Sequence, residues 1–310
     1  MHKRITFVGA SGPISALADE VRPLEGVITL EHQRGTALKP PGDVLTVDVL
    51  NRSADDVLRR AHLRAQRPGV RLTVVVMQST AVVDGERQHL LEKDADEMLW
   101  EEMEAGLRNH GRVSANYVLL MSLGGIIASA ALPMETTSQT IGFVAASIIA
   151  PAFEPVAKVA QGLVLRQWPV VGRALLSIAV GYSVLFLAAF VTSLVLVRLP
   201  TVEVGTFLEQ PVLDALSRFH LAPLLSSAAA AVAGILMVVS LRDFYVVGPL
   251  MALVMIPGVA LTAAGLAIGE TDLALGALRR VGVDLALVVL LGAAVFTWKQ
   301  RRVHRRSPLT

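Results

Sequence analysis

The stretch "SIIAPAFEPVAKVAQGL", at residues 147–163, decides how the rest of the chain is interpreted. It is as apolar as a membrane helix, yet it contains two prolines, a glutamate and a lysine. Proline removes one backbone hydrogen bond from a helix and leaves a carbonyl oxygen without its partner. Inside a membrane that oxygen needs protein, water, an ion or a substrate as its new partner. The stretch therefore predicts an interrupted membrane helix.

Composition divides the chain into a soluble third and a membrane two-thirds. Of 310 residues, 53% are hydrophobic and only 17% are charged, with a mean hydropathy of +0.57. A soluble protein carries about a quarter charged residues. Residues 1–112 contain 15 of the 28 Lys and Arg and 17 of the 26 Asp and Glu, which is an ordinary soluble balance. The main domain boundary is therefore expected near residue 112.

The soluble third alternates short β-rich runs with helical patterns. Strands are predicted at 4–10, 26–32, 43–50 and 70–79, and helices at 11–24 and 53–66. Ser11 is predicted to cap the first helix. The order β-α-β-β-α-β is that of a ferredoxin-like split unit. We therefore expect an α+β ferredoxin-like domain at residues 1–80.

Residues 81–112 are predicted to form an acidic amphipathic connector. Between 88 and 109, apolar residues recur with a period near 3.6, which is typical of a helix with one buried face. Its acidic charge disfavours binding flat on anionic lipid. Three interpretations stay open: a connector, a subunit contact in a homo-oligomer, or a solvated helix packed on its own domain.

Several classes of site are excluded or unsupported. The chain has no cysteine, which excludes disulfides, thiolate metal sites and thiol catalysis. The seven histidines lack paired metal-ligand spacing, and the catalytic patterns HExxH and GxSxG are absent from the sequence. We therefore expect no enzymatic activity, no cofactor and no metal.

The chain ends in a basic tail at 299–310, part of "WKQRRVHRRSPLT" (298–310). Such a tail could contact nucleic acid, but no recognition fold accompanies it. Directly after an apolar span it is better explained by a cytoplasmic position near anionic lipid.

The membrane domain is predicted at residues 113–298. Apolar runs long enough to span a bilayer occur at 114–134, 139–163, 171–197, 222–241, 244–269 and 280–298. The N-terminus lacks a signal peptide, so six spans place both termini in the cytoplasm and the protein in the inner membrane. Loop charges agree in part with the positive-inside rule. Arg279 and Arg280 fit poorly, because they would lie on the outer side.

An internal repeat is suggested by paired small residues and prolines. The matched positions are Gly125-Ile126 with Gly234-Ile235, Ile141-Gly142 with Val247-Gly248, Pro151 with Pro257, and Gly162-Leu163 with Gly265-Leu266. Three spans per copy would place the copies in opposite orientations, which is the inverted-repeat plan of many secondary transporters. In that plan one interrupted helix from each copy frames the binding site.

The candidate site follows from this plan. Pro151 and Pro155 would break the second span, and Pro257 with Gly258 would break the fifth. Glu154 is the candidate proton or cation site, with Lys158 as its counter-charge or an anion contact. The residues placed along the path of the substrate are Gly142, Pro151, Glu154, Pro155, Lys158, Gln161, Gly248, Pro257, Gly258 and Asp284. In the structural alternative, Glu154 and Lys158 form an ion pair at the membrane interface, and the glycines only allow close packing.

Three segments resemble the prokaryotic "uncharacterised hydrophobic protein" membrane family, a domain of unknown function with family number 389. They are "NYVLLMSLGGIIASAAL" (116–132), "TIGFVAASIIAPAFEPVAKVAQGL" (140–163) and "VGPLMALVMIPGVALTAAGLAIGE" (247–270). The resemblance covers about residues 88–298. This chain departs from the family at Glu154, where a small residue is common, and at Asp284, where asparagine is usual. The family implies a membrane protein without an established substrate.

Two functions are compatible with these features. The leading hypothesis is a transporter or channel for a small solute or ion, in contact with the lipid bilayer. The alternative is a membrane-anchored sensor or scaffold whose cytoplasmic domain binds a ligand or partner. Transport predicts that Glu154, Asp284 and both proline breaks meet at one cavity, whereas a sensor predicts a dry membrane core.

Overall fold

The computed structural model describes residues 2–79, 91, 94, 97–199, 207–240 and 244–304, with the backbone alone described at His110 and at 244–254. These residues form two compact units, an α/β domain and a helical bundle. Most of the first part of the predicted connector, the loop at 241–243 and the tail from 305 onward lie outside the described residues.

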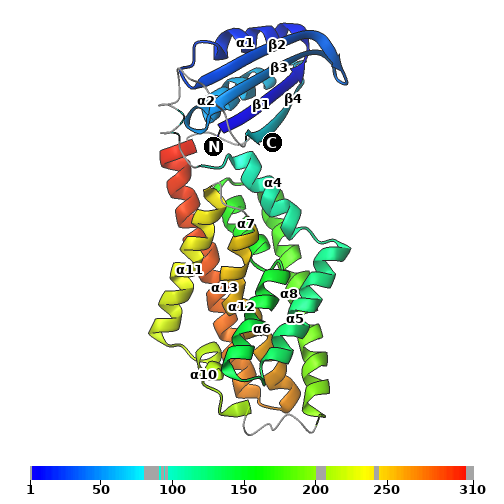
Figure 1. Cartoon of the computed structure of the whole chain (residues 1–310), viewed down its shortest axis with the longest axis vertical. Helices are drawn as coiled ribbons and strands as arrows, with labels where there is room; N and C mark the ends of the chain where they lie inside the picture. Colours follow the sequence, from blue (N-terminus) through cyan, green and yellow to red (C-terminus); the bar gives the residue numbers. More distant parts are fainter. Residues whose placement is uncertain are drawn as a thin grey trace. The chain divides into compact units, whose positions relative to one another are not determined.

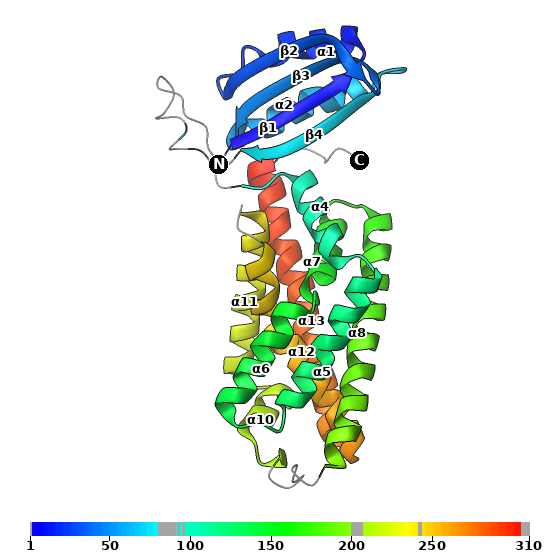
Figure 2. The same cartoon turned by 45° about the vertical axis from the view of Figure 1, so that its right-hand side comes forward.

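The α/β domain has the predicted order of elements. They are β1 (His2–Gly9), α1 (Ser11–Val21), β2 (Val27–Leu38), β3 (Pro41–Leu50), α2 (Asn51–Ala65) and β4 (Leu72–Ser79). The strands form one antiparallel sheet in the order β2-β3-β1-β4, which is the ferredoxin-like arrangement (Figures 1 and 2). The prediction for this domain is confirmed to within a few residues, except that β2 is longer.

The core of this domain lies between the sheet and its two helices. Ile5 and Phe7 on β1 and Val47 on β3 are fully buried, because alternate side chains of a strand point to the same face. Leu17 from α1 and Leu58 from α2 belong to the same buried cluster. Helices and sheet thus share one hydrophobic core.

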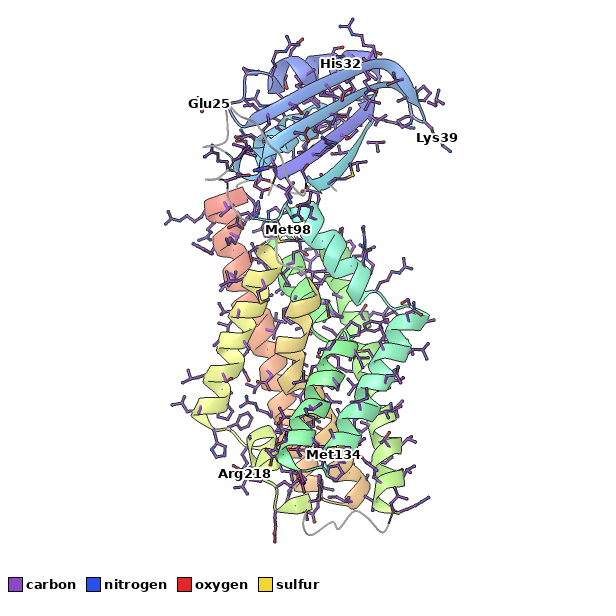
Figure 3. The ribbon with its side chains drawn as sticks, in the orientation of Figure 1. Glu25, His32, Lys39, Met98, Met134 and Arg218 are labelled. Atoms are coloured by element: carbon purple, nitrogen blue, oxygen red, sulfur yellow. The ribbon has the colours of Figure 1, made fainter. Side chains whose placement is uncertain are left out.

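Ser11 does not cap α1 as predicted. Ala10 precedes the helix, and the Ser11 hydroxyl donates to Asp43 Oδ1 at 2.6 Å. Asp43 also accepts from the Gly35 amide at 2.9 Å and contacts His32 Nε2 at 2.8 Å (His32 is labelled in Figure 3). These hydrogen bonds, with that of Ser11 the largest cause, lower the pKa of Asp43 to about 2. The carboxylate therefore ties the start of α1 to the β2–β3 hairpin.

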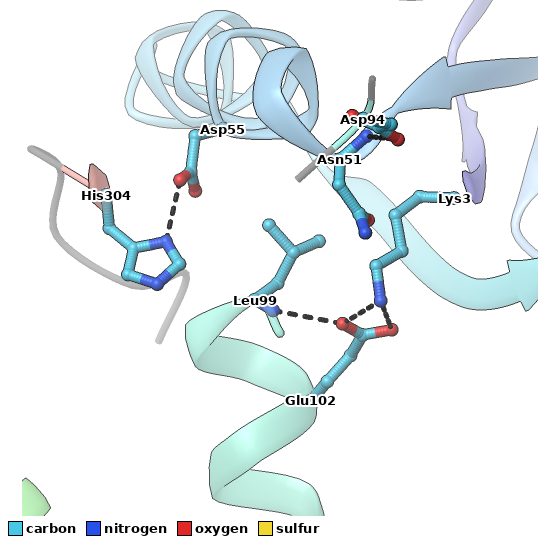
Figure 4. A network of polar contacts seen from close by, with 7 residues as sticks. All are labelled: Lys3, Asn51, Asp55, Asp94, Leu99, Glu102 and His304. Carbon is cyan, nitrogen blue, oxygen red and sulfur yellow. Dashed lines mark hydrogen bonds and ion pairs between the residues drawn. The ribbon is translucent and has the colours of Figure 1, made fainter. Parts of the chain in front are cut away.

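A polar network fixes further segments on the α/β domain (Figure 4). Lys3 is completely buried, and its Nζ donates to both carboxylate oxygens of Glu102 at 2.8 and 2.6 Å. Glu102 also accepts from the Leu99 amide at 3.0 Å. His304 Nδ1 lies 2.7 Å from Asp55 Oδ2. The Lys3–Glu102 ion pair and the His304–Asp55 hydrogen bond therefore hold residues 99–102 and His304 on this domain.

The bundle is built from helices, most of them apolar. They are α4 (Trp100–Gly111), α5 (Ala115–Ala131), α6 (Thr136–Ile149), α7 (Phe153–Val164), α8 (Trp168–Val197), α10 (Pro211–Ser217), α11 (Leu221–Val239), α12 (Phe244–Ile268) and α13 (Thr271–Lys299), followed by the π-helix η1 (Gln300–His304). The predicted helix at 88–109 is confirmed from Trp100 onward, whereas residues 97–99 are not helical.

The long helices alternate in direction along the bundle (Figures 1 and 2). We call the end where α5 and α8 begin the α4 end, and the opposite end, with α10, the α10 end. The chain runs away from the α4 end in α5, α8 and α12, and returns in α6 with α7, in α11 and in α13. Met134 and Arg218 both lie at the α10 end (Figure 3).

By length and composition, three helices of the described chain can each cross a membrane: Trp168–Val197, Leu221–Val239 and Thr271–His304. α6 and α7, bent by 51° at a short break, make a fourth when they are counted as one span. α5 and the Met255–Ile268 part of α12 are apolar but shorter. The bundle thus has the apolar helices of a membrane protein.

Candidate functional site

The predicted interruption of the second apolar segment is present. α6 ends at Ile149 and α7 begins at Phe153, so residues 150–152 form the break. Pro151 lies in this break. Pro155 does not break the helix, because it lies in the first turn of α7, where backbone N–H groups have no partner within the helix.

Tyr182 on α8 donates its hydroxyl to the Ala152 carbonyl in the break, at 3.2 Å. The same hydroxyl lies 3.9 Å from Met255 Sδ on α12. A protein side chain thus supplies one of the partners that the broken helix requires.

α7 is buried along its length, including its three polar side chains. Every residue from Phe153 to Gly162 is buried, and Glu154, Lys158 and Gln161 are 7%, 4% and 0% exposed. Lys158 Nζ lies 4.0 Å from Glu104 Oε1 on α4, so its ion-pair contact is not the predicted one with Glu154. A buried helix with this many polar groups is unusual in a membrane and indicates a site.

The Gln161 side chain is the most informative polar group of α7. Neither its Oε1 nor its Nε2 has a hydrogen-bond partner among the described residues. Buried polar groups are nearly always paired, and an unpaired amide costs about 1–3 kcal/mol. A polar partner from outside the chain would therefore be favourable for the Gln161 amide, although Gln161 lines neither of the two larger cavities described for the bundle.

Asp284 is paired with Arg280 one turn earlier in α13, with Nε 3.1 Å from Oδ2. Arg280 Nη2 also donates to the Pro223 carbonyl at 3.1 Å and to Ser227 Oγ at 2.8 Å on α11. Both Arg279 and Arg280 lie within α13, which begins at Thr271. Their predicted position in an outer loop is wrong.

A cavity of about 490 Å³ lies between α8, α12 and α13. Its polar lining residues are Tyr182, Ser183 and Thr262. Glu154 and Asp284 are not among its lining residues, so this cavity does not bring the two carboxylates together. Tyr182 lines this cavity and also donates its hydroxyl to the Ala152 carbonyl in the break.

Residues 147–290 match the model of the family described as Domain of unknown function (DUF389). The predicted family resemblance is confirmed. The match is narrower than the predicted range of about 88–298. No curated protein and no solved structure matches the chain significantly.

The DUF389 segment begins beside the break and ends within α13, so it contains α7, α8 and α12 but not the α/β domain. α12 runs through Pro257 and Gly258 without interruption, so the predicted second break is wrong. A Cβ at Gly258 would lie 2.6 Å from Val281 Cγ2, which indicates close packing on α13. Gly248 lies within α12, where only the backbone is described.

Gly142, on α6 before the DUF389 segment, packs against Ala131 of α5, since a Cβ there would overlap the Ala131 Cβ. Its role is thus close helix packing, as in the structural alternative. Gly125 likewise packs against the α8 backbone at Leu185. Both glycines are explained without a ligand.

Two turns of the DUF389 segment have the same backbone structure 103 residues apart. The Gln167 amide donates to the Gly162 carbonyl at 2.9 Å, and the Glu270 amide donates to the Gly265 carbonyl at 2.8 Å. The residue before each donor has a positive φ, 56° at Arg166 and 83° at Gly269.

The helices after these turns repeat as well. Each of the seven buried residues of α8 from Val171 to Ser193 has a buried counterpart 103 residues later, from Ala274 to Phe296 in α13. In α5 and α11 the buried positions correspond at a spacing of 110, so Gly234 matches Gly124 rather than the predicted Gly125.

Residues of α6 and α7 are separated from their counterparts in α12 by two different sequence spacings. The break between α6 and α7 accounts for the difference. Before it, Gly142 and the predicted equivalent Gly248 are 106 residues apart; after it, the spacing is 103. The difference equals the three residues 150–152, which have no counterpart in the continuous α12. In this register Pro257 would correspond to Glu154, whereas the sequence predicted a match with Pro151.

The sequence did not single out Tyr182, Tyr117 or Arg280. The Tyr117 hydroxyl donates to the Ser177 carbonyl at 2.8 Å and interacts electrostatically with Glu154. Isolated tyrosines in apolar helices have no diagnostic spacing, although there are only three in the chain. Arg280 had a usable signal, since Asp284 follows it at i+4.

Proposed function

We propose that the chain is a multi-pass inner-membrane protein that moves a small solute or ion through the bundle, with the polar side chains of α7 in its path. Both termini would be cytoplasmic, and six passes would cross the bilayer. The observation that carries the proposal is the fully buried Gln161 amide without a partner, on a helix that also buries Glu154 and Lys158.

The arrangement of charge supports this orientation. Basic residues are in excess at the α4 end of the bundle: Arg108, Arg112, Arg166, Arg173, Lys299 and Arg301, against Glu104. Acidic residues dominate the α10 end: Glu135, Glu209, Asp214, Glu270 and Asp272, against Arg198 and Arg218. Cytoplasmic ends of membrane helices carry the excess of Lys and Arg. The α4 end is therefore the cytoplasmic end in this proposal.

The two halves of the bundle support an inverted repeat. α5, α6 with α7, and α8 would form one copy, and α11, α12 and α13 the other. The matched turns and buried positions favour a common plan, and the paired helices run in opposite directions (Figure 2). Inverted repeats are common in secondary transporters, where a discontinuous helix contributes to the site.

Flux measurements test this proposal. The full-length chain would be reconstituted in liposomes, and H⁺, Na⁺, K⁺ and Cl⁻ gradients would be applied one at a time. We expect the wild-type chain to dissipate at least one gradient faster than empty liposomes. Glu154→Gln should reduce that rate about tenfold or more, as expected when an intramembrane carboxylate is neutralised. Glu135→Gln, exposed at the α10 end, is the matched control and should retain the rate.

Failure of all four gradients would favour the second candidate, a membrane-anchored sensor or scaffold. The feature that favours it is the set of ion pairs that holds Glu102 and His304 on the α/β domain (Figure 4). A ligand of this domain could act through the two helical segments that carry these residues. In neither case do we propose an enzyme, and a homo-oligomer is compatible with both.

A further inference from the structure

A second polar site lies within the bundle at its α4 end. It is a cavity of about 160 Å³ between the end of α4, α7 and the start of α8. Its lining residues are Arg108, Gly111, Arg112, Val113, Lys158, Arg173, Ala174, Leu176 and Ser177. It shares no lining residue with the larger cavity that contains Tyr182.

Four of the side chains that line this cavity are cationic: Arg108, Arg112, Lys158 and Arg173. Glu104 is the carboxylate that contacts them, at 3.4 Å from Arg108 Nη1 and 4.0 Å from Lys158 Nζ. The described lining of the cavity has four cations and no carboxylate, and Glu104 contacts two of those cations, so the described part of the cavity has an excess of positive charge.

Lys158 is the buried member of this group. Its side chain is 6% exposed, and within the described part of the chain its Nζ makes no hydrogen bond. The 4.0 Å to Glu104 is too long for one. A buried ammonium group is costly unless it is paired and hydrogen-bonded. An anion in the cavity would supply the missing acceptor.

The residues that form this cavity belong to the first half of the bundle. They are not repeated at the equivalent positions of the second half. At a spacing of 103 residues, Lys158 corresponds to Leu261 and Arg173 to Gly276. A Cβ at Gly276 would lie 2.8 Å from the Ser217 carbonyl oxygen, so α10 packs closely there. The second half thus has no cation equivalent to Lys158 or Arg173, and α10 occupies the space beside Gly276.

We propose that the four-cation cavity binds the phosphate group of an anionic ligand. Arginine forks and the lysine ammonium match phosphate oxygens with short, charge-assisted hydrogen bonds. The cavity is smaller than the about 300–1,000 Å³ of typical small-molecule pockets. It therefore holds one ionic group, with the rest of the ligand outside. The phosphate belongs either to an anionic phospholipid headgroup or to a soluble phosphate compound.

Two measurements on the full-length chain distinguish these sources. Titration calorimetry in detergent would use sodium pyrophosphate at constant ionic strength. Native mass spectrometry would count phosphatidylglycerol adducts after release from nanodiscs that contain phosphatidylglycerol and phosphatidylcholine. The variants are Lys158→Gln and Arg112→Gln, the second of which is exposed and should not affect folding. Arg198→Gln, exposed at the far end of α8, is the matched control.

We expect the wild type to bind one probe, and each cavity variant to bind it about tenfold or more weakly, as loss of a charge-assisted contact predicts. Glu104→Gln should bind more tightly, a gain that a folding defect would not produce. Binding of pyrophosphate assigns a soluble phosphate, and selective phosphatidylglycerol adducts assign a lipid headgroup. Binding of neither probe, or equal binding by the wild type and both cavity variants, would overturn the proposal. None of these outcomes depends on flux.

Discussion

Arg280 and Asp284 form an ion pair one turn apart in α13, with side chains only 1% and 3% exposed. The equivalent positions in α8 are Ser177 and Gly181, on which Tyr117 packs. A tyrosine in one half thus takes the place that an ion pair takes in the other. We therefore expect Asp284 to act mainly as the partner of Arg280, with its Oδ1 atom left without a hydrogen bond among the described residues.

A double-substitution cycle tests this role. Arg280→Leu or Asp284→Leu alone leaves a buried charge without its partner and should lower the free energy of unfolding by about 3–5 kcal/mol. The double variant should lie within about 1 kcal/mol of the wild type, because buried ion pairs are often replaceable by apolar residues. Unfolding in detergent would be followed by circular dichroism. A double variant as unstable as the single ones would contradict the structural role.

Gln161→Leu separates stability from function. Replacing an unpaired buried amide by an apolar side chain of similar size should raise the free energy of unfolding by about 1–3 kcal/mol. If Gln161 contacts a transported solute, the same change should lower the flux in liposomes. Higher stability with unchanged flux would remove Gln161 from the path. Gln139→Leu is a contrasting control, since the Gln139 amide donates to the Leu132 carbonyl at 2.7 Å and its loss should destabilise the chain.

The two matched turns predict matched effects of alanine. A Cβ at Gly162 would lie 2.8 Å from Val171 Cγ2, and one at Gly265 would lie 2.9 Å from the Ala274 nitrogen. Gly162→Ala and Gly265→Ala should each destabilise the bundle by about 1–3 kcal/mol.

Gly172 and Gly282 provide the controls, because a Cβ at either would meet nothing within 4 Å. Alanine is favoured over glycine inside helices by up to about 1 kcal/mol, so Gly172→Ala and Gly282→Ala should be neutral or stabilising. Thermal melting of the four variants in one detergent would rank them. Equal melting temperatures for both sets would contradict the close packing at the turns.

Asp43 should give the α/β domain a dependence on acid. Its pKa is about 2 in the folded chain, against 3.8 for the free side chain. A carboxylate with a depressed pKa contributes its full stability above about pH 4 and loses it as the pH falls toward 2. Hydrogen exchange of β2 and β3 in the full-length chain, corrected for intrinsic rates, should therefore quicken over this range.

Asp43→Asn is the control for this effect. The amide keeps the size of the side chain but cannot carry the charge, so the variant should be less protected at pH 7 and should lose most of the change between pH 4 and 2. An unchanged acid profile in Asp43→Asn would assign the effect to other groups.

Much of the fold follows from the sequence because its signals are local. Alternating and 3.6-residue patterns give the order of the α/β domain, and apolar length gives the helices of the bundle. The start of α13 was missed by nine residues, because Asp272, Arg279 and Arg280 lower the local hydropathy. Pairing of Arg280 with Asp284 at i+4 makes these charges tolerable within the helix.

The site was harder to predict because it depends on tertiary contacts. Burial of Glu154, Lys158 and Gln161 follows from the neighbours of α7 on several helices, which no local pattern records. Tyr182 reaches Ala152 across 30 residues of sequence. Pro257 was predicted to break its helix as Pro151 does. A helix accommodates a single proline more easily than three additional residues such as 150–152, so α12 stays continuous.

The three residues at 150–152 have a further consequence for motion. Two halves of equal construction could exchange their shapes, with each adopting in turn the conformation of the other. Here the first half contains the break at residues 150–152, whereas α12 in the second half is continuous. The two halves therefore cannot adopt each other's conformation exactly. If the two halves form the proposed inverted repeat, we expect any rearrangement between them to be asymmetric, because only the first half has a break at which it can bend.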